Sequence, residues 1–280
     1  MSGRSPRRAT TVKRPDEIDA LRRAADVVSG VHAILRDRIL PGTTTASLDA
    51  MAEEYIRDHG GSPAFKGYIM GDDTPPYPST LCMSLNDIVV HGFPSDRPLE
   101  QGDIISVDVG VKLDDYHGDC ACTYAVGTID EEKEKLLRVT RDALMRGVEQ
   151  AVTGKWIYDI AGAVQRHVES EGFSVVRELV GHGIGRDLHE EPAVPNFVPN
   201  PFSRHRFRNQ RLEEGMVICI EPMVNAGVYR VTTDEDGWTV RTGDAKPSAH
   251  FEHMVVVREG KAEVLTSHIL EHLGESAPAA

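Results

Sequence analysis

Two aspartates on either side of a predicted turn are the residues of this sequence with the clearest capacity for chemistry. Asp108 lies in the segment 104–113, which is rich in β-branched side chains, and Asp119 precedes a second strand-like segment at 120–126. The polar pair at 114–115 separates the two segments, so the pattern predicts a β-hairpin. With a turn centred at 113.5, the two carboxylates would oppose each other on one sheet face, roughly 5 Å apart. Two ionised carboxylates that close repel, so this pair must share a proton or bind cations.

Further acids and histidines lie at the ends of other strand-like segments. His182 stands between two glycines, and His189 follows seven residues later. Glu221 ends one apolar segment, and Glu252 precedes another. A carboxylate at the end of a buried strand is costly without a partner. Each of these residues taken alone is typical of a strand terminus or a loop, whereas together they indicate one shared site.

Four carboxylates and one imidazole can together neutralise two divalent cations. Oxygen ligands with a single nitrogen suit Mn, Fe, Co or Zn at a two-metal spacing of about 3.5 Å. Two cations would also relieve the repulsion between Asp108 and Asp119. The alternative is a proton-sharing pair of the aspartic-protease kind, which needs no glutamate or histidine nearby. The residue types therefore favour a dinuclear metal site.

The elements that must position these residues form two similar successions along the chain. Each half, 14–128 and 129–268, is predicted to contain two amphipathic helices followed by strands. This order predicts an α+β fold in which the sheets of both halves join within one domain. A basic arm precedes the domain at 1–13, and a tail follows it at 269–280. The predicted helices cover 16–37, 45–59, 131–150 and 157–171, and the predicted strands cover 81–85, 88–92, the hairpin at 104–126, 175–180, 216–222, a hairpin at 237–242, 248–257 and 262–265, with a loop at 191–210.

Composition and charge exclude several classes of protein. The chain has 280 residues, of which 40% are hydrophobic and 27% charged, as in globular domains. Its net charge of −13 argues against general nucleic-acid binding by the folded part, and no sequence-specific nucleic-acid partner is expected. It contains neither a run of about 18 apolar residues that would span a membrane nor a secretory signal. No feature indicates a large apolar interface, so a monomer is expected. The cysteines lack zinc-type CxxC spacing and indicate reduced thiols in the cytoplasm; they are Cys82, Cys120, Cys122 and Cys219.

The first 14 residues differ from the rest because they carry basic residues and no acid. Two interpretations are open for this arm. It is either a disordered, solubilising segment or a contact for an RNA-rich surface such as the ribosome. The basic residues are Arg4, Arg7, Arg8, Lys13 and Arg14.

Seven short segments, in order and at family spacing, closely resemble the type I methionine aminopeptidases of bacteria. The resemblance covers about residues 14–268 and implies the pita-bread fold of creatinase and the aminopeptidases. That fold has two pseudo-symmetric αβ halves around a curved antiparallel sheet. The resemblance also implies a metal-dependent methionyl aminopeptidase, a hydrolase that removes the initiator methionine from nascent polypeptides when the second residue is small. The segments lie at 91–92, 106–110, 118–123, 181–185, 189–192, 220–223 and 251–253.

The resemblance assigns roles to individual residues. In the family pattern two metal ions activate a hydroxide, and Glu221 also moves a proton to the leaving amine. His189 would stabilise the oxyanion, and His91 would orient the peptide. Asp108 would chelate one ion, Asp119 and Glu252 would bridge both, and His182 and Glu221 would bind the other, so the implied metal ligands are Asp108, Asp119, His182, Glu221 and Glu252.

The resemblance also implies a methionine pocket and a minor cation site. An apolar, polarizable lining suits a thioether side chain. Asn86 and Ser248 match positions that hold a monovalent cation in some relatives. The implied pocket residues are Tyr68, Tyr77, Cys82, Leu188 and Trp238, together with His91 and His189.

Some positions depart from the family pattern. Leu188 stands where many relatives have Phe, which would widen the pocket. His250 stands where Gln is frequent, two residues before Glu252, which would alter the surroundings of the metal ligands. The loops at 71–75 and 199–208 are longer than usual.

Two alternatives share the implied fold. Prolidases and aminopeptidases that act on X-Pro bonds have the same five ligands but carry a large extra domain, and only 90 residues precede His91 here. A non-catalytic pita-bread binding protein would have lost ligands, whereas all five are present in this sequence.

Overall fold

The computed structural model describes residues 12–71, 74–200 and 207–266. Most of the predicted arm at 1–13, the tail at 269–280 and parts of the loops at 71–75 and 199–208 lie outside the described residues. Within the described ranges, no helix is both long and apolar enough to cross a membrane.

The helices begin and end within two residues of their predicted bounds. Local signals explain this agreement. The Thr44 side chain accepts a hydrogen bond from the backbone N–H of Ser47 and caps the second helix, and Asp130 caps the third in the same way through Lys133. Pro15 stands in the first turn of the first helix, where its missing N–H costs nothing. The helices are α1 (Pro15–Arg36), α2 (Thr45–Asp58), α3 (Glu131–Val148) and α4 (Ile157–Ser170).

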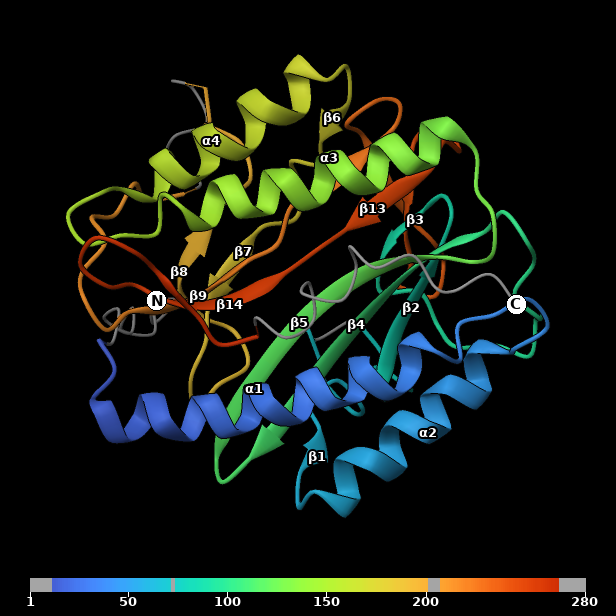
Figure 1. The fold of residues 1–280 in the computed structure, drawn as a ribbon, viewed down its shortest axis with the longest axis horizontal. Coiled ribbons are helices and arrows are strands. Elements are labelled where there is room, and N and C mark those ends of the chain that lie inside the picture. The colour runs from blue at the N-terminus through green and yellow to red at the C-terminus, as the bar shows by residue number, and fades with distance from the viewer. Residues whose placement is uncertain (1–11, 72–73, 201–206, 267–280) are drawn as a thin grey trace, which may run out of the picture.

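The strands form one main sheet in each half of the chain, with two smaller sheets beside them. In the first half, β4 pairs with β1, β2 and β5, and in the second half the order is β15-β14-β9-β7-β8. Helices α1 and α2 lie along the first sheet, and α3 and α4 lie along the second (Figure 1). The strands are β1 (Ser62–Pro63), β2 (Leu81–Leu85), β3 (Ile88–Val90), β4 (Ile104–Leu113), β5 (Tyr116–Ala125), β6 (Ser174–Val175), β7 (Gly181–Gly183), β8 (Glu190–Val194), β9 (Val217–Ile220), β10 (Met223–Asn225), β11 (Val231–Thr233), β12 (Val240–Thr242), β13 (Ser248–His250), β14 (His253–Val256) and β15 (Glu263–Val264).

The β4–β5 hairpin has a different register from the one predicted. Asp114 and Asp115 both have positive φ (48° and 67°), as in a two-residue type I′ turn, so the turn is centred between them. Asp108 therefore pairs with Ala121, and Asp119 pairs with Gly110. The direct opposition expected for a centre at 113.5 is wrong. The two aspartates are diagonal neighbours on the same sheet face, a separation that long side chains or a shared ligand can span.

Two strands of the second half are interrupted, each at an acid. Glu221 and Pro222 separate β9 from β10, and Phe251 and Glu252 separate β13 from β14. The β9–β14 and β10–β13 ladders share one register, which sets position 221 opposite position 252. Pro222 has no N–H for the ladder, so the continuous strand predicted at 248–257 is broken at this point.

The two halves are joined at this interruption. The backbone N–H of Glu252 donates to the carbonyl of Ala121 in β5, at 2.8 Å. The Thr123 hydroxyl donates to the carbonyl of His250 at 2.8 Å. These bonds bring β5 of the first half against the acids of the second.

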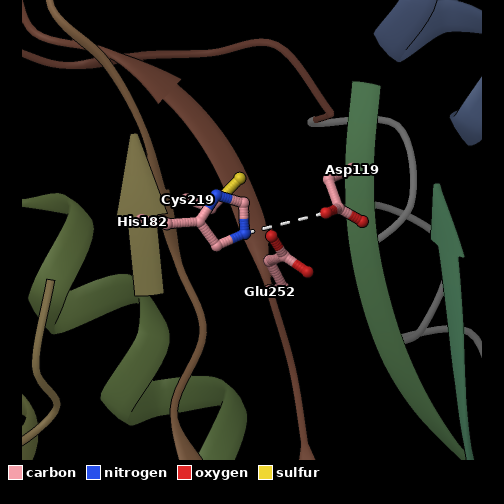
Figure 2. Close-up of side chains that lie close together, drawn as sticks. All are labelled: Asp119, His182, Cys219 and Glu252. Carbon is pink, nitrogen blue, oxygen red and sulfur yellow. Dashed lines mark ion pairs between the residues drawn. The ribbon is translucent and has the colours of Figure 1, made fainter. Parts of the chain in front are cut away.

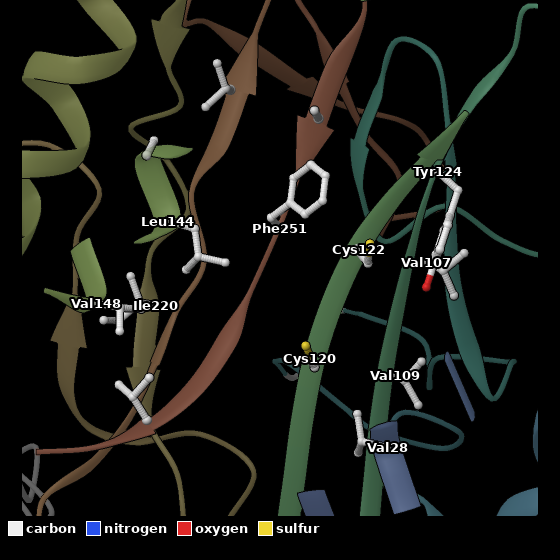
Figure 3. Close-up of a cluster of buried hydrophobic side chains, with 14 of the residues drawn as sticks. Val28, Val107, Val109, Cys120, Cys122, Tyr124, Leu144, Val148, Ile220 and Phe251 are labelled. Carbon is white, nitrogen blue, oxygen red and sulfur yellow. The ribbon is translucent and has the colours of Figure 1, made fainter. Parts of the chain in front are cut away.

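One buried apolar cluster extends through both halves. It contains Val28 of α1, Val109 of β4, Leu144 of α3 and Ile220 of β9, with Phe251 between the two sheets (Figure 3). Because this cluster is continuous, each sheet buries its inner face against elements of both halves.

Several further segments differ from their predicted structure. The strand predicted at 175–180 ends at Val175, and the hairpin predicted at 237–242 is formed instead by β11 and β12. The predicted loop at 191–210 begins inside a strand, β8, although Pro192 lies within it. β8 is the edge strand of its sheet, where a missing N–H is tolerated. Lys13, predicted to belong to the arm, is buried in the folded body. Its Nζ lies 2.6 Å from Glu190 Oε2, and its N–H donates to Gly215 at 2.9 Å.

His32 on α1 leads to a prediction about stability. It is buried, with its ring nitrogens 2.9 Å from the Tyr124 hydroxyl and 3.1 Å from the Cys120 carbonyl, and burial lowers its pKa to about 4. A lowered pKa gives stability that is present above about pH 6.5 and is lost as the pH falls towards 4. We expect chemical denaturation to show wild type losing about 3 kcal/mol more than His32→Gln over this range. Equal losses in both proteins would contradict the prediction.

Candidate active site

Glycines on both sides of His182 allow β7 to lie close to its neighbours. A Cβ at Gly181 would come within 2.4 Å of the Cys219 carbonyl oxygen, and one at Gly183 within 2.3 Å of the Glu191 carbonyl oxygen. No larger residue fits these positions without moving the backbone. The Gly-His-Gly pattern therefore has a packing cause, and it brings the His182 side chain to the junction of the sheets.

His182 faces carboxylates from both halves of the chain. Its Nε2 lies 3.7 Å from Asp119 Oδ2 and 3.6 Å from Glu221 Oε1. These separations are too long for hydrogen bonds, but two atoms that ligate one cation lie about this far apart when each bond is about 2.1 Å.

Four side chains from three strands and one strand break form a candidate metal-binding cluster. They are Asp119 on β5, His182 on β7, Cys219 on β9 and Glu252 between β13 and β14 (Figure 2). One ligand atom from each lies within 4.8 Å of the others. The sequence motifs do not reveal Cys219, although strand alternation places it on the same face as Glu221.

Unpartnered buried atoms indicate that this site fits cations. Asp108 Oδ1, Asp119 Oδ1 and Glu252 Oε1 are buried and have no hydrogen-bond partner in the described part of the chain. Unsatisfied buried carboxylate oxygens are costly unless protonated or ligating. Glu221 and Glu252 also oppose each other where the two ladders meet, and their negative charges repel. Cations would ligate the unpartnered oxygens and offset this repulsion.

The electrostatics of the site agree with this reading. Burial raises the pKa of Asp108 to about 7 and that of Glu221 to about 8. Burial, together with repulsion from the neighbouring carboxylates, also raises the pKa of Asp119 and that of Glu252. Burial lowers the pKa of His182 to about 3, so its imidazole is neutral and has a lone pair for a metal.

All the predicted site residues line one cavity of about 420 Å³. The five predicted metal ligands lie in its wall with the seven predicted pocket residues. The wall thus combines a polar, ligand-rich part with an apolar part. The apolar part includes Phe65, Tyr68, Tyr77, Cys82, Leu188, Met223 and Trp238.

Aromatic contacts and hydrogen bonds fix the apolar wall. The Tyr77 hydroxyl donates to the carbonyl of Gly92 at 2.9 Å, and Trp238 Nε1 donates to Pro75 at 2.7 Å. The rings of Tyr77 and Trp238 pack edge to face at 5.2 Å, and His91 packs against Trp238 at 5.8 Å. His91 has φ of 59°, a left-handed conformation that is uncommon outside glycine and often occurs at functional sites.

The Tyr68 hydroxyl is a hydrogen-bond partner of the His189 ring. The Tyr68 hydroxyl lies 2.7 Å from His189 Nδ1, and burial lowers the pKa of His189 to about 4. Because the phenol is protonated at neutral pH, it can donate to Nδ1. When Tyr68 is the donor, the neutral imidazole carries its proton on Nε2, and Nε2 can donate a hydrogen bond.

The positions matched to a monovalent-cation site are also neighbours. The Asn86 carbonyl accepts a hydrogen bond from the Ser248 N–H at 2.8 Å, and Asn86 has φ of 50°. A cation held there stays a prediction.

Residues 19–259 match metallopeptidase family M24. The chain is 46% identical to a methionine aminopeptidase of Clostridium perfringens over 91% of this chain and 98% of that protein. It is 45% identical to methionine aminopeptidase 1 of Bacillus subtilis over the same shares. The crystal structure of a methionine aminopeptidase from Rickettsia prowazekii superimposes with a TM-score of 0.85 at 36% identity, over 92% of this chain and 100% of that one. These matches confirm the predicted pita-bread fold and do not favour the X-Pro alternative.

Proposed function

The chain belongs to metallopeptidase family M24 as a methionine aminopeptidase, and from that premise we propose which residues bind its metals and which carry out hydrolysis. The single observation that supports this division most strongly is the convergence of unpartnered buried carboxylate oxygens beside an apolar cavity wall. One part of the cavity suits cations, and the other suits a methionine side chain.

The metal ligands would be the five predicted from the sequence, with two divalent ions between them. Asp119 and Glu252 come from different halves and suit a bridging role, since both belong to the metal-binding cluster and each has a buried oxygen without a partner among the described residues. When bound, the ions would polarise the scissile carbonyl and lower the pKa of water. A set of oxygens with one imidazole and a nearby thiol, Cys219, suits Mn, Fe, Co or Zn better than Mg or Ca.

The methionine side chain would occupy the apolar part of the cavity. Tyr77 and Trp238 offer aromatic edges, and Cys82 a buried sulfur, to a thioether. The free α-amine of the substrate would lie at the carboxylates, which limits cleavage to the first peptide bond. The substrates would be nascent polypeptides in the cytoplasm with a small second residue, as in Met1-Ser2 of this chain.

Three residues would act on the peptide itself. His91 would orient the bond, and His189 would donate from Nε2 to the carbonyl oxygen as negative charge develops. Glu221 would take a proton from the attacking water and return it to the departing amine. Carbon–nitrogen cleavage then releases free methionine and the shortened peptide.

The experiment that tests this function is a peptide assay on metal-stripped protein. Met-Gly-Met, Met-Trp-Met and an X-Pro dipeptide are offered with Co, Mn, Fe or Zn added back. We expect metal-dependent release of methionine from Met-Gly-Met alone. Cleavage of the X-Pro peptide instead, or binding of metal without any cleavage, would contradict the proposal.

Replacing His189 tests its assigned role separately from metal binding. His189→Ala is expected to lower kcat about 10²- to 10³-fold, as loss of an oxyanion donor does elsewhere. Tyr68→Phe should cause a smaller loss, because the histidine proton is then no longer directed to Nε2. His59→Gln, on the exposed end of α2, serves as the control. A metal content lowered in parallel with kcat would show that His189 acts as a ligand rather than on the substrate.

A further inference from the structure

His250 is a buried residue of the cavity wall that the proposed reaction does not use. It lies at the end of β13, opposite Met223 of β10, and is 2% exposed. Its N–H donates to the Thr123 hydroxyl at 2.9 Å, and its carbonyl accepts from the same hydroxyl at 2.8 Å. The Thr123 hydroxyl thus fixes the backbone of His250, and the burial of the side chain limits its rotation.

The Nε2 atom of this imidazole is buried and has no hydrogen-bond partner among the described residues. A buried polar group left without a partner costs about 1–3 kcal/mol. The Asp108 carboxylate interacts with this imidazole electrostatically, and the oxygen of Glu221 nearest to Nε2 is Oε2, at 3.6 Å. This separation slightly exceeds a hydrogen bond, and a small rotation of the Glu221 carboxylate would close it.

Glu221 is flanked by a histidine on each of its two oxygens. Oε1 faces His182 Nε2 at 3.6 Å, and Oε2 faces His250 Nε2 at 3.6 Å. An oxygen held by a hydrogen bond is fixed in direction, which decides how the other oxygen meets a cation. His182 therefore faces the oxygen that would meet a cation, whereas His250 faces the other oxygen of the same carboxylate.

We propose that His250 is a positioning residue, whose Nε2–H donates to Oε2 of Glu221 and thereby holds Oε1 towards His182 and the metal. The inference rests on the proposed function, because it concerns a ligand of the same site. A hydrogen-bond donor at position 250 differs from a metal ligand there in one respect that can be measured. A donor can be replaced by another N–H, whereas an imidazole ligand cannot be replaced by an amide nitrogen.

Two substitutions separate the roles. His250→Gln keeps an N–H donor of similar reach, and His250→Ala removes it. Calorimetric titration of the metal-stripped proteins with Mn(II) gives the affinity, and Met-Gly-Met hydrolysis gives kcat and KM. His32→Gln, at a buried histidine outside the cavity wall, is the matched control, and thermal unfolding checks that each variant folds.

The expected result is rescue by glutamine. His250→Ala should weaken Mn(II) binding about 10- to 100-fold, in the range found for residues that orient metal ligands. His250→Gln should remain within about threefold of wild type, because it restores the donated hydrogen bond. Equal weakening of Mn(II) binding in both variants would overturn the proposal in favour of metal ligation by His250. Unchanged affinity in His250→Ala would show that His250 does not affect metal binding and would also overturn the proposal. If wild type binds no Mn(II), the proposed function fails instead, so the two failures are distinct.

Discussion

Asp119→Asn is expected to reduce metal-dependent hydrolysis of Met-Gly-Met by about a thousandfold or more. The change keeps the size of a side chain that is only 5% exposed. It removes a negative charge that would help to hold a cation beside His182 and Glu252. Losing the cation costs several kcal/mol of transition-state stabilisation, and each 1.36 kcal/mol is a factor of ten in rate. The measurement is kcat/KM beside metal content per chain.

The same hairpin offers a matched control for this prediction. Asp115→Asn makes the same chemical change at an exposed turn position with positive φ, which asparagine tolerates. Its contacts with Lys112 and Arg186 are long and exposed, so little change is expected in activity or stability. Activity of Asp119→Asn within tenfold of wild type would be incompatible with a bridging role for Asp119.

The metal-free protein is expected to lose stability as the pH rises above 6.5. Burial raises the pKa of Asp108 to about 7 and that of Glu221 to about 8, whereas an unfolded carboxyl has a pKa near 4. A raised pKa means that the folded state holds protons that the unfolded state has released. Stability is therefore full at low pH and is lost as the pH rises through the folded pKa. At 1.36 kcal/mol per pKa unit, these two groups predict a loss of about 3 kcal/mol between pH 6.5 and 8.

Denaturant unfolding of the metal-stripped protein at several pH values measures this effect. The buried histidines contribute in the opposite sense at the lower end of this window, because each is half protonated in the unfolded state at pH 6.5. Asp108→Asn keeps the same histidines, so comparing its profile with that of wild type isolates the carboxylate. Saturating Mn(II) should remove the fall, because cations replace the protons between the carboxylates. Asp108→Asn should make the fall shallower. Equal slopes in wild type and Asp108→Asn would mean that the Asp108 carboxylate is solvated rather than buried among its neighbours.

The sequence alone determined the helices and the chemical types at the site. Each helix is a local structure, set by apolar spacing and by capping residues such as Thr44 and Asp130, so its bounds need no tertiary information. Motifs such as Gly181–Gly183 and Glu221-Pro222 are likewise short and specific. They indicated the family, the fold and the candidate ligands before any contact between the two halves was known.

Only the tertiary structure decided how these residues meet. Strand alternation fixes the face on which a side chain lies, but the partner across the ladder depends on turn geometry and on breaks in pairing. The type I′ turn at Asp114 and Asp115 sets Asp119 diagonal to Asp108, and the register shared by the β9–β14 and β10–β13 ladders sets Glu221 opposite Glu252. The contacts that define the site join residues far apart in the sequence, from 39 positions between His182 and Glu221 to 121 positions between Tyr68 and His189. Such distant pairing is a property of the packed sheets, and no local pattern encodes it.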